Sequence, residues 1–104
     1  IRGMAHITGG GITENTPRML SKGTQALIRK GTWDIHPIFS LVKKKAGVDD
    51  DEMYRDFNMG IGMVLAVPAK QADAVIRKAN KLGEKAYRIG EIVKGKSIVK
   101  YEEK

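Results

Sequence analysis

The chain has 104 residues, of which 41% are hydrophobic, and it carries a formal net charge of +7 and no cysteine. A chain of this length builds one modest core, so residues 1–104 are expected to form a single domain. The lack of cysteine excludes a disulfide framework and thiolate chemistry, and no apolar run approaches the roughly 20 residues of a membrane helix, so we expect a cytoplasmic protein that binds no membrane.

The first predicted elements surround a run of three glycines. Residues 4–8 are expected to form a strand that ends in Gly9, Gly10 and Gly11. Pro17 must lie in the first turn of the helix that follows, because deeper inside a helix it would break the hydrogen-bond ladder. This short helix is expected to end near Leu20.

The middle of the chain predicts one strand and two helices. Residues 25–29 form the strand, and Pro37 then opens a helix that Gly47 ends. The apolar residues of this helix share one face: Ile38, Phe39, Val42 and Ala46. Asp49 with Glu52 three residues later is typical of a capping box and predicts a short helix after it.

The last elements complete an α+β fold. Residues 61–67 are apolar at nearly every position, which predicts a central strand covered on both faces. Apolar residues recur every three or four positions over residues 69–82, as in an amphipathic helix. Residues 86–93 and 97–101 are expected to form two strands joined as a hairpin through residues 94–96. Together these elements predict layered helices on a mixed, largely antiparallel sheet.

The three glycines also indicate a site for an anion. Glycine allows a positive φ and close approach of the backbone to a ligand, and amides at a helix N-terminus favour negative charge. A second stretch of the same character contains Asn58 and Gly60 and precedes the most apolar strand. A plain tight turn explains such glycines equally well.

Several separated motifs together resemble one family. They are the run AHITGGG at residues 5–11, Glu14-Asn15 with Pro17-Arg18, Pro37-Ile38-Phe39, the run from Glu52 to Met63, and Gly83-Glu84 with Ile89-Gly90-Glu91-Ile92. In this combination the chain resembles the C-terminal part of the phosphoribosylformylglycinamidine cyclo-ligases, also called aminoimidazole ribonucleotide synthetases. Ser21 and Asp56 depart from the family pattern, which usually has proline and threonine there.

The resemblance implies an ATP-dependent enzyme of purine biosynthesis. Its reaction closes the imidazole ring of formylglycinamidine ribonucleotide to give aminoimidazole ribonucleotide, ADP and phosphate. In the family an N-terminal domain holds ATP and Mg²⁺, so no cofactor is expected on this chain alone. The chain begins at Ile1 rather than at methionine. We therefore expect a piece of a longer polypeptide that lacks that domain and the first elements of its own, and whose intact form is a homodimer.

The same resemblance implies the roles of individual residues. His6 is implied to handle a proton or contact the substrate, and imidazole suits this role because it exchanges protons near neutral pH. A lone histidine near a strand end is also often a structural hydrogen-bonding residue. The expected ligands of the substrate phosphate share the two glycine-rich corners: Thr8, Gly9, Gly10, Gly11, Asn15, Asn58 and Gly60. Threonine and asparagine at such positions often cap helices or close turns instead, and Thr8, Asn15 and Asn58 are open to the same interpretation.

Other functions are less well supported by the sequence. The basic residues are scattered, and aromatic residues make up only 6% of the chain, so we expect no binding of nucleic acid. The acidic run from Asp49 to Glu52 lacks the spaced ligands of a calcium loop, and no metal site is expected. Two alternatives remain, which are another ATP-dependent member of the same superfamily and a non-catalytic phosphate-binding module.

Overall fold

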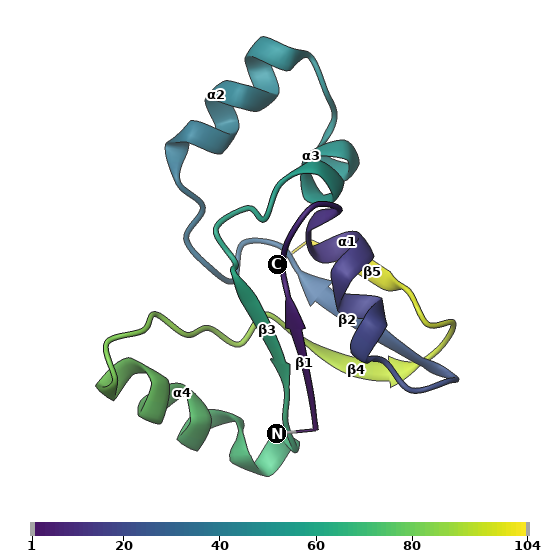
Figure 1. The fold of residues 1–104 in the computed structure, drawn as a ribbon, viewed down its shortest axis with the longest axis vertical. Helices are drawn as coiled ribbons and strands as arrows, with labels where there is room; N and C mark the ends of the chain where they lie inside the picture. The colour runs from purple at the N-terminus through teal and green to yellow at the C-terminus, as the bar shows by residue number, and fades with distance from the viewer. Residues whose placement is uncertain (1, 104) are drawn as a thin grey trace.

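Five strands form two separate sheets in the computed structural model, which describes residues 2–103 and therefore neither Ile1 nor Lys104. Strand β1 (Gly3–His6) pairs antiparallel with β3 (Met63–Ala66). In the second sheet β2 (Thr24–Arg29) lies between β4 (Gly90–Lys94), which is antiparallel to it, and β5 (Val99–Glu102), which is parallel. The α+β class and the mixed, largely antiparallel pairing are confirmed, but the strands are divided over two sheets (Figure 1).

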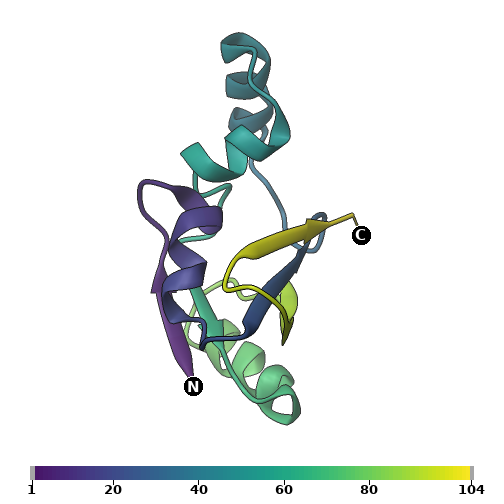
Figure 2. The ribbon, with the colours of Figure 1, turned by 90° about the vertical axis from the view of Figure 1, so that its right-hand side faces the viewer.

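The helices lie around these sheets and at the two ends of the molecule. Their bounds are Gly11–Asn15 (α1), Pro37–Ala46 (α2), Asp50–Asp56 (α3) and Ala72–Lys81 (α4), with short 3₁₀ turns at Thr16–Met19 (η1) and Ala69–Gln71 (η2). Figure 2 shows α2 at one end of the long axis and α4 at the other. Neither α2 nor α4 has a buried residue.

Local rules account for the ends of the helices. Pro17 lies in the first turn of η1 as predicted, although α1 already begins at Gly11. Gly47 ends α2 in the left-handed conformation with φ 69°. The Asp49 side chain accepts a hydrogen bond of 2.9 Å from the backbone N–H of Glu52, which confirms the predicted cap of α3.

Two predictions about the strands are wrong. Residues 61–67 are not covered on both faces, because Val64 is buried while Met63 and Leu65 are 48% and 38% exposed. The strand belongs to a ribbon of only two strands, and one face of this ribbon packs on the core. The expected hairpin is also absent from residues 2–103, because β2 lies between β4 and β5 and takes the hydrogen bonds of both.

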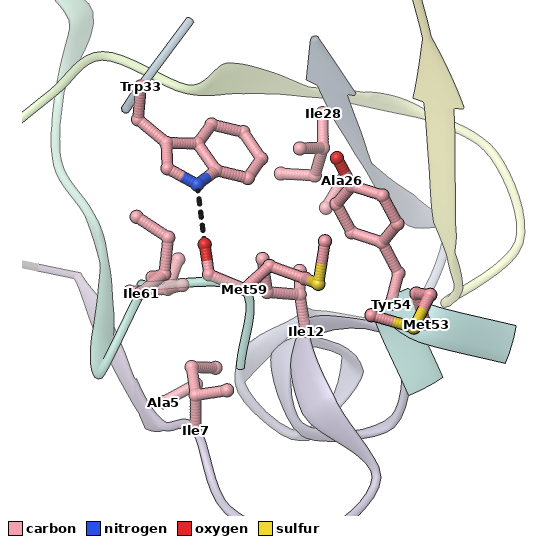
Figure 3. Packing of buried hydrophobic residues seen from close by; sticks show 11 residues of the cluster. Ala5, Ile7, Ile12, Ala26, Ile28, Trp33, Met53, Tyr54, Met59 and Ile61 are labelled. Atoms are coloured by element: carbon pink, nitrogen blue, oxygen red, sulfur yellow. Dashed lines mark hydrogen bonds between the residues drawn. The ribbon is translucent and has the colours of Figure 1, made fainter. Parts of the chain in front are cut away.

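The core lies between the two sheets and is closed by α1 and α3 (Figure 3). Ile12 and Met53 are fully buried, and Trp33 is 5% exposed. The Trp33 ring meets the Tyr54 ring edge to face, with centroids 6.3 Å apart. Helix α2 is held against α3 and the residue after it by contact between Phe39 and Phe57 and by the ion pair of Lys43 with Asp50. The hydrogen bond from Lys43 lowers the pKa of the Asp50 carboxyl.

Candidate functional site

The glycine run forms a tight turn between β1 and α1. Gly10 and Gly11 have φ of 96° and 60°, in the left-handed region that favours glycine. The Gly11 N–H donates to the Thr8 carbonyl at 2.9 Å, and the Glu14 N–H donates to the Gly10 carbonyl at 3.1 Å. The turn therefore has a defined backbone shape.

The three glycines have different surroundings. A Cβ on Gly11 would overlap the backbone carbonyls of Tyr54 and Phe57, the second at 2.6 Å, so this glycine lets α1 pack closely on the end of α3. A Cβ on Gly10 would lie 2.7 Å from the Cβ of Glu14. A Cβ on Gly9 would meet nothing within 4 Å. Of the three, Gly9 is the one open to an approaching ligand.

Asn15 holds the turn from the inside. It is 2% exposed, and its Nδ2 donates to the carbonyls of Thr8, Gly9 and Gly11 at 3.2, 3.2 and 2.8 Å. Its Oδ1 accepts a hydrogen bond of 3.3 Å from the Thr8 hydroxyl. Because the amide is occupied within the turn, Asn15 acts on a ligand through the shape that it gives to the loop.

The second glycine-rich corner is a tight turn from Asn58 to Ile61. The Ile61 N–H donates to the Asn58 carbonyl at 3.0 Å, and the Asn58 Oδ1 accepts from the Gly60 N–H at 2.8 Å. Both central residues have positive φ, 53° at Met59 and 91° at Gly60, as in the turns that connect hairpins. Trp33 fixes this turn through a hydrogen bond of 3.0 Å from its Nε1 to the Met59 carbonyl.

The two corners meet at one depression of about 360 Å³. Its wall contains Thr8 and Gly9 from the first corner and Asn58 from the second, and it is completed by Ile7, Phe39, Asp56 and Phe57. The structure thus brings three of the predicted ligands together. Gly10, Gly11 and Asn15 lie outside this wall in the adjoining turn, and Gly60 lies in a separate groove beside Asp34 and His36.

Charges of both signs surround the glycine turn. The Glu14 side chain covers Gly10 and pairs with Arg55 at 3.8 Å between Oε1 and Nε. Arg55 also pairs with Glu52 at 3.7 Å, and Asp56 lies in the wall of the depression. The sequence reasoning did not foresee these carboxylates beside an anion site. The spacing of four residues between Gly10 and Glu14 could have indicated that the Glu14 side chain lies beside the glycine turn, because residues one helical turn apart are neighbours.

His6 lies near the depression but outside its wall. It is exposed on β1, where it is the register partner of Met63 on β3. Since neighbouring side chains on a strand point to opposite faces, His6 projects away from the buried Ile7, on the same face as Met4. The other histidine, His36, occupies the position before α2 and makes no capping hydrogen bond with its side chain.

Residues 2–103 contain no group of three or more His, Cys, Asp or Glu side chains placed to hold a metal ion. The same residues include no helix long and apolar enough to span a membrane.

Comparison with known proteins gives consistent matches over almost the whole chain. The family model described as AIR synthase related protein, C-terminal domain, matches residues 1–102. A phosphoribosylformylglycinamidine cyclo-ligase of Bacillus cytotoxicus is 54% identical over 98 residues, which are 94% of this chain and 28% of that protein. Proteins of the same name from Thermoanaerobacter sp. (strain X514) and Trichlorobacter lovleyi are each 52% identical, over 95% and 88% of this chain.

The chain spans less than a third of the length of these curated relatives, namely 28%, 30% and 26%. The family match extends over both glycine-rich corners and over every strand and helix described above. The chain therefore belongs to the family of AIR synthase related proteins and represents its C-terminal domain.

Proposed function

We propose that this chain is the C-terminal part of a phosphoribosylformylglycinamidine cyclo-ligase. Such an enzyme would convert formylglycinamidine ribonucleotide to aminoimidazole ribonucleotide with ATP, in the cytoplasm, as a step of purine biosynthesis. The observation that carries the proposal is the agreement in name of relatives that are about half identical to this chain. Ring closure of this kind depends mostly on positioning and charge stabilisation, which a rigid wall of the site supplies.

The chain's own share would be the wall that receives the phosphate of the ribonucleotide. The open backbone at Gly9 and the side chains of Thr8 and Asn58 surround one depression. The Asn58 Nδ2 and the backbone at Gly9 would supply hydrogen-bond donors to it, because the Thr8 hydroxyl already donates to Asn15. Glu14 and Asp56 oppose an anion there, while Arg55 neutralises part of the charge of Glu14. A phosphate would therefore bind at Gly9, on the side of the turn away from Glu14.

His6 would act as a proton donor or acceptor toward the reacting part of the substrate. Its side chain is exposed on β1, two residues before Thr8, so it is accessible to a substrate held at the glycine turn. ATP and Mg²⁺ would bind to an N-terminal domain that faces this wall, and ATP would supply the phosphoryl group that activates the amide oxygen. We further propose that the intact enzyme is a homodimer.

The test is a chimaera in which this chain replaces the 98 matched residues of the Bacillus cytotoxicus relative. The chimaera should form aminoimidazole ribonucleotide and release phosphate in equal amounts. The 104-residue chain alone should release no phosphate above background from Mg-ATP and substrate. A chimaera that folds like its host and has no activity would contradict the proposal.

A non-catalytic phosphate-binding module is the second candidate. It is favoured by the fact that the turn and the depression are complete within residues 2–103. In that case the isolated chain should bind ribose 5-phosphate, while the folded chimaera remains inactive.

A further inference from the structure

A hydrogen bond joins the end of the chain to the helix that follows the glycine turn. Thr13 is the middle residue of α1, and its hydroxyl lies 2.8 Å from the phenol hydroxyl of Tyr101, which comes 88 residues later. Tyr101 lies on β5, at one edge of the second sheet. Figure 1 shows β5 beside α1. The bond therefore connects the last strand to the element next to the candidate site.

The place of α1 depends on its contacts with the rest of the protein, because a helix of five residues is not stable by itself. Ile12 is fully buried, and Glu14 pairs with Arg55 of α3. Within residues 2–103, the bond to Tyr101 is the one side-chain hydrogen bond or ion pair that joins α1 to the second sheet. Tyr101 therefore fixes α1 against that sheet, as Arg55 does against α3.

Movement of α1 would be transmitted to the glycine turn by Asn15. This residue lies two positions after Thr13, and its Nδ2 donates to the carbonyls of Thr8, Gly9 and Gly11 at 3.2, 3.2 and 2.8 Å. A shift or rotation of α1 would change these distances, and hydrogen bonds weaken steeply when their geometry is poor. The position of Thr13 is therefore linked to the shape of the turn.

The phenol ring of Tyr101 is itself held in place. It packs on the ring of Tyr54, with centroids 4.7 Å apart, and the Nζ of Lys30 lies 5.6 Å from its centroid, within the range of a cation–π contact. Burial raises the pKa of the phenol to about 12, so the hydroxyl keeps its proton at neutral pH. Tyr101 thus presents a fixed hydroxyl to α1.

Tyr101 and Thr13 both lie outside the wall of the depression, so neither touches a ligand held at Gly9. An effect of Tyr101 on such a ligand has to pass through α1 to Asn15, and from Asn15 to the carbonyl of Gly9. This makes Tyr101 a candidate for a positioning residue.

We propose that Tyr101 positions the phosphate-binding turn at Gly9 by holding α1 through Thr13. Tyr101 has this role only if the turn receives the substrate phosphate, so the inference rests on the proposed function. Without the hydroxyl, α1 moves more freely, and the turn presents its open backbone to the phosphate in a less defined shape. The phosphate is bound alike in the ground state and in the transition state, so the loss falls on KM and not on kcat.

The kinetic test uses the chimaera, at a temperature at which every variant is folded. Tyr101→Phe keeps the ring and removes the hydroxyl, and it should raise KM for formylglycinamidine ribonucleotide by about 3- to 10-fold, the effect of one net hydrogen bond. The change in kcat should be less than about twofold. Tyr54→Phe is the matched control, because the Tyr54 hydroxyl makes no hydrogen bond within residues 2–103. Equal KM values for the two variants would overturn the proposal.

Substitutions at Thr13 separate the bond from the ring that makes it. Thr13→Val removes the hydroxyl at a similar shape and should raise KM as much as Tyr101→Phe. Because each variant removes the same bond, the double variant should be no worse than either single one. Thr13→Ser keeps the hydroxyl and should retain the KM of the parent. Increases that multiply in the double variant would contradict the proposal, since the two residues would then act independently.

Amide hydrogen exchange of the 104-residue chain examines the turn without any activity. The amides of Gly11 and Glu14 donate to carbonyls of the turn at 2.9 and 3.1 Å. In Tyr101→Phe both should exchange about 3- to 10-fold faster, and in Tyr54→Phe at the rate of the wild type. Unchanged exchange in Tyr101→Phe would overturn the proposal. An inactive parent chimaera together with faster exchange in Tyr101→Phe would count against the proposed function and still support the hold of Tyr101 on the turn.

Discussion

The indole Nε1–H of Trp33 donates a hydrogen bond of 3.0 Å to the carbonyl oxygen of Met59, in the interior of the protein. Met59 has a φ of 53°, which side-chain-bearing residues rarely adopt. The hydrogen bond therefore holds a strained residue of the turn that carries Asn58 into the wall of the depression. A loop residue outside the wall of the depression thus determines the shape of one corner of the candidate site.

Two substitutions of Trp33 should destabilise the protein to different extents. Trp33→Phe keeps an aromatic ring but leaves the buried Met59 carbonyl without its donor, so the free energy of unfolding should fall by about 1–3 kcal/mol. Trp33→Ala also opens a cavity and should cost about 3–5 kcal/mol. Urea denaturation measures both values. A Trp33→Phe variant as stable as the wild type would mean that the hydrogen bond contributes nothing.

Asn15 should be more sensitive than its small size indicates. Asn15→Ala leaves the carbonyls of Thr8, Gly9 and Gly11 without a donor, and we expect a loss of about 2–4 kcal/mol in urea denaturation. Asn15→Asp keeps the shape but directs a carboxylate toward the same carbonyls. It should be the less stable of the two at pH 7, and the difference should shrink at acidic pH, where the carboxyl is protonated. The reverse order at pH 7 would contradict the described contacts.

Gly9 and Gly10 separate the needs of binding from those of folding. Gly10→Ala places a Cβ against Glu14 at a φ of 96°, so unfolding should become easier by about 1–2 kcal/mol. Gly9→Ala meets no neighbour and should change stability by less than about 0.5 kcal/mol.

If the turn binds the phosphate of the substrate, Gly9→Ala should still weaken binding, because the new methyl group stands where the ligand approaches. Titration of the chimaera with substrate, beside urea denaturation of the isolated chain, distinguishes the two effects. Normal binding by Gly9→Ala would exclude the open backbone at Gly9 as the phosphate site.

His6→Ala should act on activity alone. In the chimaera kcat/KM should fall by at least about 100-fold, the lower range for a positioned acid or base. The exposed side chain makes no hydrogen bond or ion pair within residues 2–103, so the Tm should stay close to that of the parent. Activity close to that of the parent would return His6 to an ordinary surface residue.

Tyr101 makes a loss of stability at high pH predictable. Burial raises the pKa of its phenol to about 12, although its hydrogen bond with Thr13 acts the other way. The folded state therefore keeps a proton that the unfolded chain loses near pH 10, and stability should fall between about pH 10 and pH 12.

The fall in unfolding free energy should be at most about 2–3 kcal/mol, and smaller where solvent reaches the ring. Denaturation of the wild type and of Tyr101→Phe across this range gives the measurement. The variant should lose part of the slope and retain the part due to Tyr54, whose pKa burial also raises. Identical slopes would show that Tyr101 does not contribute.

The sequence predicted features that depend on nearby residues better than those that depend on distant ones. The cap at Asp49, the end of α2 at Gly47 and the position of Pro17 were correct because each rule acts within one helical turn. The hairpin of residues 86–101 was wrong because a strand from far earlier in the chain pairs with both of its arms. The local sequence of residues 86–101 gives no sign that β2 pairs with both strands in place of the hairpin.

The candidate site was predictable to a similar degree. The two glycine-rich corners marked Thr8, Gly9 and Asn58, which the fold brings into one depression. The internal role of Asn15 was open in the sequence, since an asparagine after a glycine turn either contacts a ligand or satisfies the turn itself. Asn15 is only 2% exposed, so in this structure it satisfies the turn itself.

The central position of β2 has a consequence for how the protein is made. Its two neighbours, β4 and β5, come from the end of the chain, so Ala26 and Ile28 leave the ribosome long before either partner exists. Until then both edges of β2 are open to pairing with other chains, which is a route to aggregation. A nascent chain that stalls before residue 90 has made the middle of a sheet without its neighbours, and we expect the cell to treat it as a client of chaperones and proteases.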